Sequence, residues 1–429
     1  MADAYSVDLT TGILSYDDAN PPFTMTSKLF NNDLNLLCNG YGHYYIDSGM
    51  AKVDDNGFSR SDRELSIRGN IRFLSGNYIV LGADDIIQLS YYMDIGQALP
   101  VGATPSASLN ITLNNIDGRF NDGSWNMSSD RFDGAEIRIY IMAKTDTPAY
   151  DEFLLGLFNI ESVENQEHTA VVKIKATDHM ATRMMRPYVD NLTYPATYGD
   201  ILQRACSIAW IQNNTPTFTY YDEVVSTAPT FPDGTTCRDV IGWILTLACA
   251  NGFINRSAHF VARTMNSADA DASVPYSMYY QLNKSNFPIC SNYTVAIYPP
   301  DAPAGTAPRT YTNGIGGADG RAYLLEIRDN PFIFHSETAI NDALAQRISE
   351  IGLWMVTRGS GRFSWHGDET VEICDTVEIE KSNGLKVNIG VLQQRIEFGP
   401  ETGLVFESGC DLAGTTLVQS TLGQYGWGE

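Results

Sequence analysis

The sequence lacks the features that place a chain in a membrane or on a secretory route. It has no apolar run of about 18 residues, the length that a membrane-spanning helix needs. Its start, Met1-Ala2-Asp3-Ala4, has no basic segment followed by an apolar run, so no secretory signal is expected. The cysteines contain no CxxC pair, which predicts reduced, mostly buried thiols of a protein made in a cytoplasm, with neither a disulfide framework nor a zinc knuckle. They are Cys38, Cys206, Cys237, Cys249, Cys290, Cys374 and Cys410.

Motifs for catalysis and metal binding are also missing. There is no GxSxG, HExxH, GxxxxGK[ST] or GxGxxG in a suitable context. Asp178-His179 could belong to a catalytic triad, but no serine or cysteine carries a partner signature, so a structural histidine is favoured. The other histidines, which show no metal-ligand spacing, are His43, His168, His259, His335 and His366.

Two glycine turns are candidates for calcium loops, and one acidic pair is a candidate for a glycosidase-like site. Lys52 and Leu113 occupy the first ligand positions before Gly57 and Gly118, and neither side chain can coordinate calcium. The pair Asp84-Asp85 suits a solvated turn better than a catalytic pair. We therefore predict no catalytic, cofactor-binding or metal-binding residue, no cofactor, and no enzymatic activity.

Charge is sparse and strongly acidic. Charged residues make up 18%, below the usual level of about 25%, and Tyr occurs 23 times among many Asn, Thr, Ser and Gly residues. This composition favours strands and turns over an all-helical fold. The 51 acidic residues outnumber the 28 basic ones, for a net charge of −23, which disfavours tight binding of nucleic acid or anionic lipid. The acidic charge either keeps the protein soluble or gives it a surface that does not bind DNA passing close by.

Alternating apolar and polar residues predict several short strands. In residues 106–113, Leu109, Ile111 and Leu113 share one face, and serine, asparagine and threonine share the other. The same alternation predicts strands at 137–141, 153–163, 170–176, 293–298, 371–379 and 385–391. Within the 371–379 row, Asp375 marks a turn or an internally bonded carboxylate. Antiparallel strands of this kind suggest small barrels or sandwiches.

Helical spacing predicts three helices. They are expected at about residues 200–210, at 236–250 with Asn251-Gly252 as the stop signal, and at 335–351. Phe253 to Val261 then reads as a strand. The chain divides into five predicted segments: 1–63, an N-terminal arm or elaboration; 64–180, a first β-barrel domain; 181–265, a small α+β domain; 266–325, a loop-rich β region; and 326–429, a second β-barrel domain with a C-terminal tail.

The order of short motifs over residues 84–400 resembles the phage tail hub family, also called tail-associated or baseplate hub proteins, and in particular the N-terminal module of such proteins from phages of Gram-positive bacteria. Residues 1–60 and 266–320 carry none of these motifs. The matching stretches are Asp84–Ile87, Ser106–Leu113, Asn115–Phe120, Phe132–Ile137, Leu155–Phe158, Ala176–Met180, Tyr194–Leu202, Thr236–Trp243, Asp329–Ile333, Trp365–Asp368 and Cys374–Val377.

The resemblance implies a β-rich α+β protein in which two tail-tube-like β-barrel domains flank a smaller mixed region. It further implies a homotrimer whose six barrels form a pseudo-sixfold ring at the tail tip or baseplate of the virion, assembled in the bacterial host cytoplasm. The implied partners are the tail tube or distal tail protein on one side and a tail tip, spike or fibre protein on the other, with the tape measure protein as a further candidate. Genomic DNA would pass through the channel without specific binding. Many relatives carry a C-terminal hydrolase or adhesin, and the end at Glu429 favours a structural role.

Two other functions stay open on the residues alone. A receptor-binding or carbohydrate-binding tail adhesin fits the richness in Tyr and Trp, although most tryptophans fall in predicted elements and are expected in the core. They are Trp125, Trp210, Trp243, Trp354 and Trp365. A peptidoglycan hydrolase is disfavoured by the missing His, Cys and Glu constellations.

Overall fold

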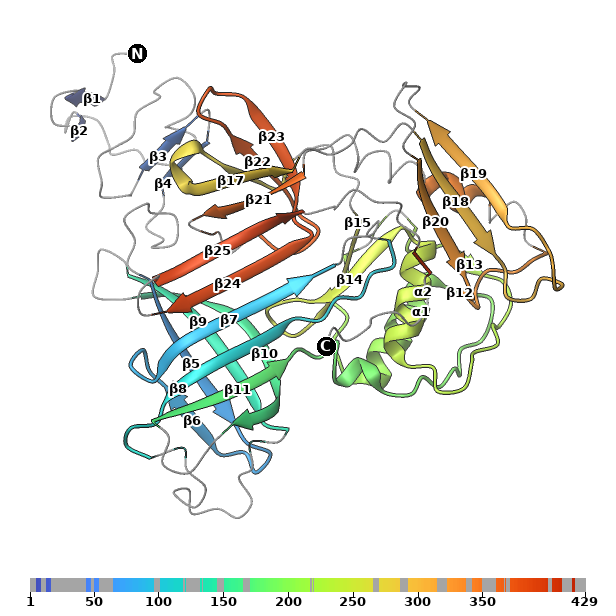
Figure 1. Ribbon diagram of the computed structural model, residues 1–429, viewed down its shortest axis with the longest axis horizontal. Coiled ribbons are helices and arrows are strands. Elements are labelled where there is room, and N and C mark those ends of the chain that lie inside the picture. Colours follow the sequence, from blue (N-terminus) through green and yellow to red (C-terminus); the bar gives the residue numbers. More distant parts are fainter. Residues whose placement is uncertain are drawn as a thin grey trace.

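The computed structural model describes most of the chain between residues 65 and 410 (Figure 1). The described ranges are 65–95, 101–118, 134–144, 150–164, 170–216, 220–264, 270–285, 292–314, 322–336, 342–348, 360–365, 371–399 and 403–410, with a few single positions between them and short strands near both ends. Near those ends the strands are β1 (Tyr5–Asp8), β2 (Ile13–Tyr16), β3 (Tyr44–Asp47), β4 (Met50–Val53) and β26 (Gln419–Ser420).

An eleven-stranded antiparallel sheet dominates the molecule. Its two ends are the edge strands β17 and β6, so these strands form an open sheet and do not close on themselves. In spatial order the strands are β17 (Tyr279–Ser285), β21 (Ser360–Trp365), β25 (Gly403–Cys410), β24 (Gln393–Gly399), β7 (Ile86–Asp94), β8 (Ser108–Asn114), β11 (Val171–Thr177), β10 (Tyr150–Glu164), β9 (Glu136–Lys144), β5 (Leu65–Arg72) and β6 (Tyr78–Leu81). The β-rich α+β class predicted from the sequence is confirmed, whereas the two expected barrels do not appear as closed barrels among the described strands, eleven of which form one open sheet instead.

The sheet joins the two β regions that lie far apart in the sequence. Strand β7 pairs with β24 from Leu89 opposite Phe398 to Asp94 opposite Gln393. One further bond, from Ile95 N to Leu392 O at 2.9 Å, extends the contact beyond the strands. Figure 1 shows these blue and red strands side by side near the middle of the sheet. The N-terminal and C-terminal regions are therefore held together by backbone hydrogen bonds.

The predicted alternation sets which face of each strand is buried. In β8, Leu109, Ile111 and Leu113 are buried, and Ser108 and Asn110 point to the opposite face. The isoleucines at 137, 139 and 141 in β9 are fully buried in the same way. Each such side chain contributes about 1.5–3 kcal/mol through removal from water. This apolar face forms the core of the first β region.

Two helices and a hairpin form the mixed middle region. They are α1 (Tyr198–Ala209), α2 (Cys237–Leu247), β14 (Ala250–Ile254) and β15 (Phe260–Thr264), with β12 (Ala196–Thr197) and β13 (Val224–Val225) as a short pair. Both helices begin with a capping box, Thr197 with Asp200 and Thr236 with Asp239, which satisfies free backbone N–H groups at each start. The helices predicted at about 200–210 and 236–250 are confirmed, with ends within three residues of those expected. The residues Asn251-Gly252 do not stop α2, because they already lie inside β14.

Other elements differ from the sequence-based expectation. The range 253–261 is not one strand, because a turn at 255–259 separates β14 from β15. Residues 371–375, expected to begin a strand, form a turn before β22. Of the helix expected at 335–351, the structure describes residues 342–348 as helical, and the start of this helix lies outside the described residues. The remaining elements are η2 (Arg183–Met185), η3 (Tyr276–Met278), a sheet of β16 (Ala272–Val274), β22 (Thr376–Glu380) and β23 (Lys386–Gly390), and a sheet of β19 (Arg309–Gly314), β18 (Asn292–Tyr298), β20 (Ala322–Arg328) and β26. The five domain boundaries stay predictions.

Two further observations concern cysteines and membranes. Cys206, Cys237, Cys249 and Cys374 are buried free thiols, and burial raises the pKa of the Cys374 thiol to about 12. Within the described part of the chain, no helix combines the length and apolar character required to cross a bilayer.

Candidate functional site: the junction of the three regions

A tight turn between β14 and β15 carries side chains toward the C-terminal β region. Asn255 closes this turn: its Oδ1 accepts a hydrogen bond from His259 N at 2.9 Å, and its backbone N–H donates to His259 O at 2.8 Å. Ala258 within the turn has a φ of 63°, a left-handed conformation that this closure maintains. Because the turn is held at both ends, Arg256 within it and Arg263 on β15 leave the hairpin at fixed positions.

The opposite side of the junction is the turn that precedes β22. Its stabilising group is Asp375, whose Oδ2 accepts a hydrogen bond from Glu372 N at 2.7 Å. Backbone bonds from Cys374 N to Val391 O at 2.9 Å and from Val391 N to Asp375 O at 2.8 Å tie the turn to the end of β23. The sequence predicted a turn or an internally bonded carboxylate at Asp375, and both are present.

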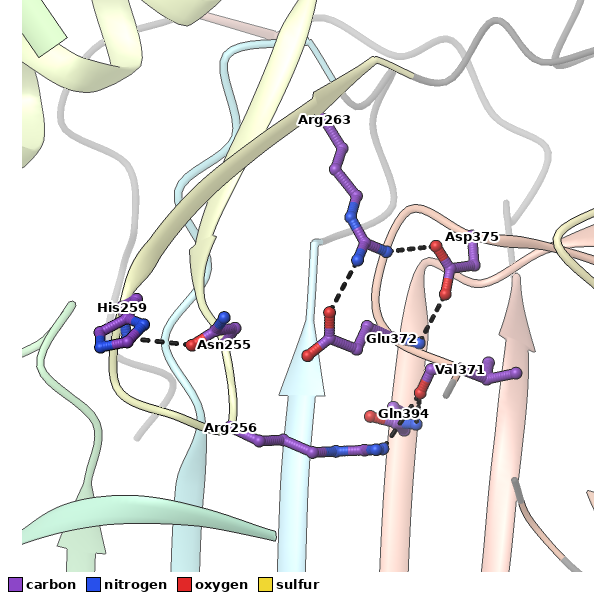
Figure 2. Close-up of polar contacts among 8 residues, drawn as sticks. All are labelled: Asn255, Arg256, His259, Arg263, Val371, Glu372, Asp375 and Gln394. Carbon is purple, nitrogen blue, oxygen red and sulfur yellow. Dashed lines mark hydrogen bonds and ion pairs between the residues drawn. The ribbon is translucent and has the colours of Figure 1, made fainter. Parts of the chain in front are cut away.

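Arginine side chains join the two turns (Figure 2). The guanidinium of Arg263 lies between two carboxylates: Nη2 is 2.8 Å from Glu372 Oε2, and Nη1 bonds Asp375 Oδ1. The side chains of Arg256 and Gln394 both donate to the carbonyl oxygen of Val371, at 3.0 and 3.1 Å. The hairpin of the middle region, the turn before β22 and strand β24 are thus bonded together at one place.

Burial makes these polar contacts consequential. Desolvation raises the pKa of Asp375 to about 6, and the nearby Arg263 guanidinium opposes that shift. A charge removed from water depends on its partner, so deleting one member of such a pair costs more than the pair itself contributes. The contacts therefore fix the relative position of the regions more than they add to overall stability.

The first β region meets the junction at Asp178, which with His179 directly follows β11. The Asp178 carboxylate accepts bonds from Ala107 N at 2.8 Å and Met180 N at 2.9 Å, and burial raises its pKa to about 7. The His179 ring contacts the Asn159 amide nitrogen at 2.8 Å, and burial lowers its pKa to about 4, so it is neutral at pH 7. The two side chains therefore have different hydrogen-bond partners.

The segment before β8 ties the same region to α2 and β14. Gly102 N donates to Ala250 O at 2.8 Å, and Ala103 N donates to Asn251 Oδ1 at 3.1 Å. The Arg238 guanidinium donates to Thr104 O at 2.6 Å. Gly102 has a φ of 76°, and a Cβ on it would lie 1.9 Å from Thr246 Oγ1. Only glycine fits this close approach of the segment before β8 to α2.

The junction leaves no room for a substrate. The cavity bounded by Asp178, Arg256, Glu372 and Gln394 has a volume of about 20 Å³, which is space for one water molecule. Among the described residues, no group of three or more His, Cys, Asp or Glu side chains is arranged to hold a metal ion. This arrangement can hold three regions in position.

The remaining histidines and tryptophans fall in different surroundings. His259 and His335 lie in turns, whereas His43, His168, His366, Trp125 and Trp354 lie outside the described residues. Trp243 and Trp365 are buried, as expected. Trp210 is 73% exposed, so the expectation that it packs in the core is wrong; as the C-cap of α1 in a left-handed conformation, it turns outward. No sequence signal distinguished it from the core tryptophans.

Comparison with known proteins supports the fold and nothing finer. No protein-family model matches the sequence, and no curated protein matches it. A tail protein from Neisseria meningitidis MC58 superposes with a TM-score of 0.52 at 10% identity, covering 80% of this chain and 95% of that one. The 43 kDa tail protein of prophage MuSo2 from Shewanella oneidensis gives 0.53 at 10% identity, covering 81% and 97%. The chain has a phage tail-protein fold, which confirms the resemblance predicted from the motifs at the level of fold.

Proposed function

We propose that the chain is a structural tail hub protein of a phage or a phage-tail-like particle. Three copies would form a pseudo-sixfold ring that joins the hexameric tail tube, or a distal tail protein, to the tail tip, spike or fibre and lets DNA pass. The observation that carries this proposal is the pairing of β7 with β24, which presents two β regions of one chain as a single rigid sheet. Three such chains offer six β regions to a sixfold tube.

The edges of the sheet support closure through neighbouring copies. Edge strand β6 exposes Tyr78 and Val80, and edge strand β17 exposes Tyr280. An exposed edge with apolar side chains is a site for pairing with another chain. Head-to-tail contacts between different edges give a closed ring when the rotation between copies closes. The net charge of −23 would repel DNA from the channel wall.

The oligomeric state tests the proposal. We expect light scattering to give three times the 47.3 kDa chain mass, and electron micrographs to show threefold rings. Val80→Lys and Tyr280→Lys should reduce the mass to that of a monomer, because lysine on an edge blocks pairing. Leu385→Lys is the control, because Leu385 is equally exposed but lies in the turn between β22 and β23. A chain that stays monomeric at every concentration, or a trimer that both edge variants leave intact, contradicts the proposal.

A purely structural role also requires that the chain has no cell-wall hydrolase activity. The missing His, Cys and Glu constellations of known hydrolases support this part of the proposal. Purified protein incubated with bacterial cell walls is expected to release no soluble muropeptides above a buffer control. Release that increases in proportion to protein concentration contradicts it.

A further inference from the structure

A second concave site adjoins the junction, on the outer face of β5, β9 and β10. It has a volume of about 450 Å³, within the range of small-molecule pockets. Its floor is this face of the sheet, and its walls are η2, the end of α1 and the turn between β14 and β15. Its lining includes Arg72, Glu136, Arg138, Arg183, Trp210 and Gln212.

The register of the sheet places the basic side chains together. Arg72 on β5 lies opposite Glu136 on β9. Arg138 follows Glu136 by two residues on β9, so these two side chains share one face of the sheet. Arg183 of η2 donates to Glu136 Oε1 at 2.8 Å, which neutralises the one carboxylate of the lining. Within the described ranges, no residue forms a hydrogen bond or ion pair with the guanidinium of Arg72 or Arg138. Two uncompensated cations therefore face one groove in a chain whose net charge is −23.

The rim of the groove is an exposed aromatic ring. Trp210 is held by its backbone, where its N–H bonds Cys206 O and Ser207 O at the end of α1. The Arg186 guanidinium lies 3.8 Å from the ring centroid, so one face of the indole is covered and its orientation is fixed. A large exposed aromatic ring with a fixed orientation beside unpaired hydrogen-bond donors is the chemistry that stacks on a sugar ring and binds its substituents.

We propose that this groove binds an anionic sugar, one that carries a carboxylate or phosphate group. Arg72 and Arg138 hold the anion through charge-assisted hydrogen bonds, Gln212 contributes a neutral amide for hydroxyl groups, and Trp210 stacks on the ring. The site is independent of the hub ring proposed above, because none of its residues belongs to β6, β17 or the β7–β24 contact. A binding role of this kind also fits the adhesin alternative from the sequence.

Binding is tested with the full-length chain and four probes: glucose 6-phosphate, glucuronic acid, glucose and inorganic phosphate. Calorimetry and tryptophan fluorescence report on each titration. We expect at least one of the two acidic sugars to bind, glucose not to bind, and inorganic phosphate to bind at least about tenfold more weakly than the acidic sugar, since it cannot stack. Trp210→Phe should remove the fluorescence change while the chain stays folded.

Variants separate the groove from general charge. Arg138→Gln and Arg72→Gln should each weaken binding about tenfold, on the scale of one charge-assisted contact. Arg395→Gln is the matched control, because Arg395 is an exposed strand arginine of the same sheet outside the groove, and it should bind as the unmodified chain does. Circular dichroism confirms that each variant folds.

Several outcomes overturn the proposal. The first is that neither acidic sugar binds at concentrations up to about 10 mM, at which even a weak site would be detected. The second is that inorganic phosphate binds as tightly as the acidic sugars, or that Arg138→Gln leaves the affinity for the sugar unchanged. The third is that Arg138→Gln abolishes self-association while no sugar binds. The groove would then be a contact for carboxylates of another copy of the chain.

Discussion

Arg263 on β15 and Asp375 before β22 form an ion pair across 112 positions of sequence, and Glu372 shares the same guanidinium. The pair connects the β14–β15 hairpin to the turn before β22, and among the described residues no backbone hydrogen bond joins these two turns. Both side chains are mostly buried, so each charge is stabilised by its partner in place of the water it has lost. The relative position of the two regions is therefore sensitive to a single side chain.

Arg263→Gln is expected to lower the free energy of unfolding by about 2 kcal/mol, because it leaves Asp375 and Glu372 without their cation. The measurement is urea denaturation at neutral pH. Arg395→Gln is the control, since its pair with Glu397 is largely exposed and its loss should cost about 0.5 kcal/mol. Equal losses in both variants would show that the junction pair has no special weight.

Gly102→Ala is expected to destabilise the chain by several kcal/mol, roughly 3 or more, through overpacking against α2 together with an unfavourable positive φ. Gly76→Ala isolates the second cause, because Gly76 has a φ of 91° but no atom within 4 Å of a Cβ placed there. It should cost only about 1–2 kcal/mol. Thermal unfolding of both variants measures the difference, which is the steric part of the cost. No difference would mean that the segment before β8 separates easily from α2.

Ile244→Asp is expected to cost several kcal/mol, because Ile244 on α2 is fully buried and the substitution introduces an unpaired charge into the core. Gln203→Asp, on the exposed side of α1, introduces the same charge in water and should change stability by about 0.5 kcal/mol or less. Differential scanning calorimetry compares the two. An unchanged melting temperature for Ile244→Asp would contradict packing of α2 on the middle region.

Asp178 and His179 are expected to give opposite pH dependences that offset each other. The pKa of Asp178 is raised from 3.8 to about 7, so between these values the folded state holds a proton that the unfolded chain has lost, and stability falls as pH rises. The pKa of His179 is lowered from 6.5 to about 4, so the unfolded chain binds the extra proton there, and stability rises with pH. Each slope is about 1.4 kcal/mol per pH unit.

Single substitutions should separate these two slopes. Relative to the unmodified chain, stability of Asp178→Asn should rise more steeply between about pH 4.5 and 6.5, whereas stability of His179→Gln should fall. Urea denaturation across that range gives both slopes. Parallel curves for all three proteins would mean that neither group titrates differently in the folded state.

Local pattern was enough to predict much of the fold. The apolar row at Leu109, Ile111 and Leu113 predicted β8 and its buried face, and helical spacing predicted α1 and α2. Pairing between distant strands was not predictable, because nothing in the residues around Asp94 specifies Gln393 as a neighbour. The same limit applies to β17, which joins the main sheet from a segment that composition alone marked as loops.

The two candidate sites differ in how far the sequence revealed them. Asp375 stood out as a carboxylate within an apolar row, and it is the centre of the junction. The arginine groove gave no signal, because Arg72 and Arg138 each occupy an ordinary polar position of an alternating strand. Only the register of β5 with β9 brings them together.

The pairing of β7 with β24 has a consequence for synthesis on the ribosome. Strand β7 emerges early, whereas Gln393, the partner of Asp94, is translated 299 residues later. At roughly 5–20 residues per second, that delay is about 15–60 s. Throughout it, the nascent chain keeps one side of β7 without its native neighbour, open to pairing with nascent chains on the same messenger. The yield of correctly folded protein should therefore depend on translation speed and on how closely ribosomes follow one another.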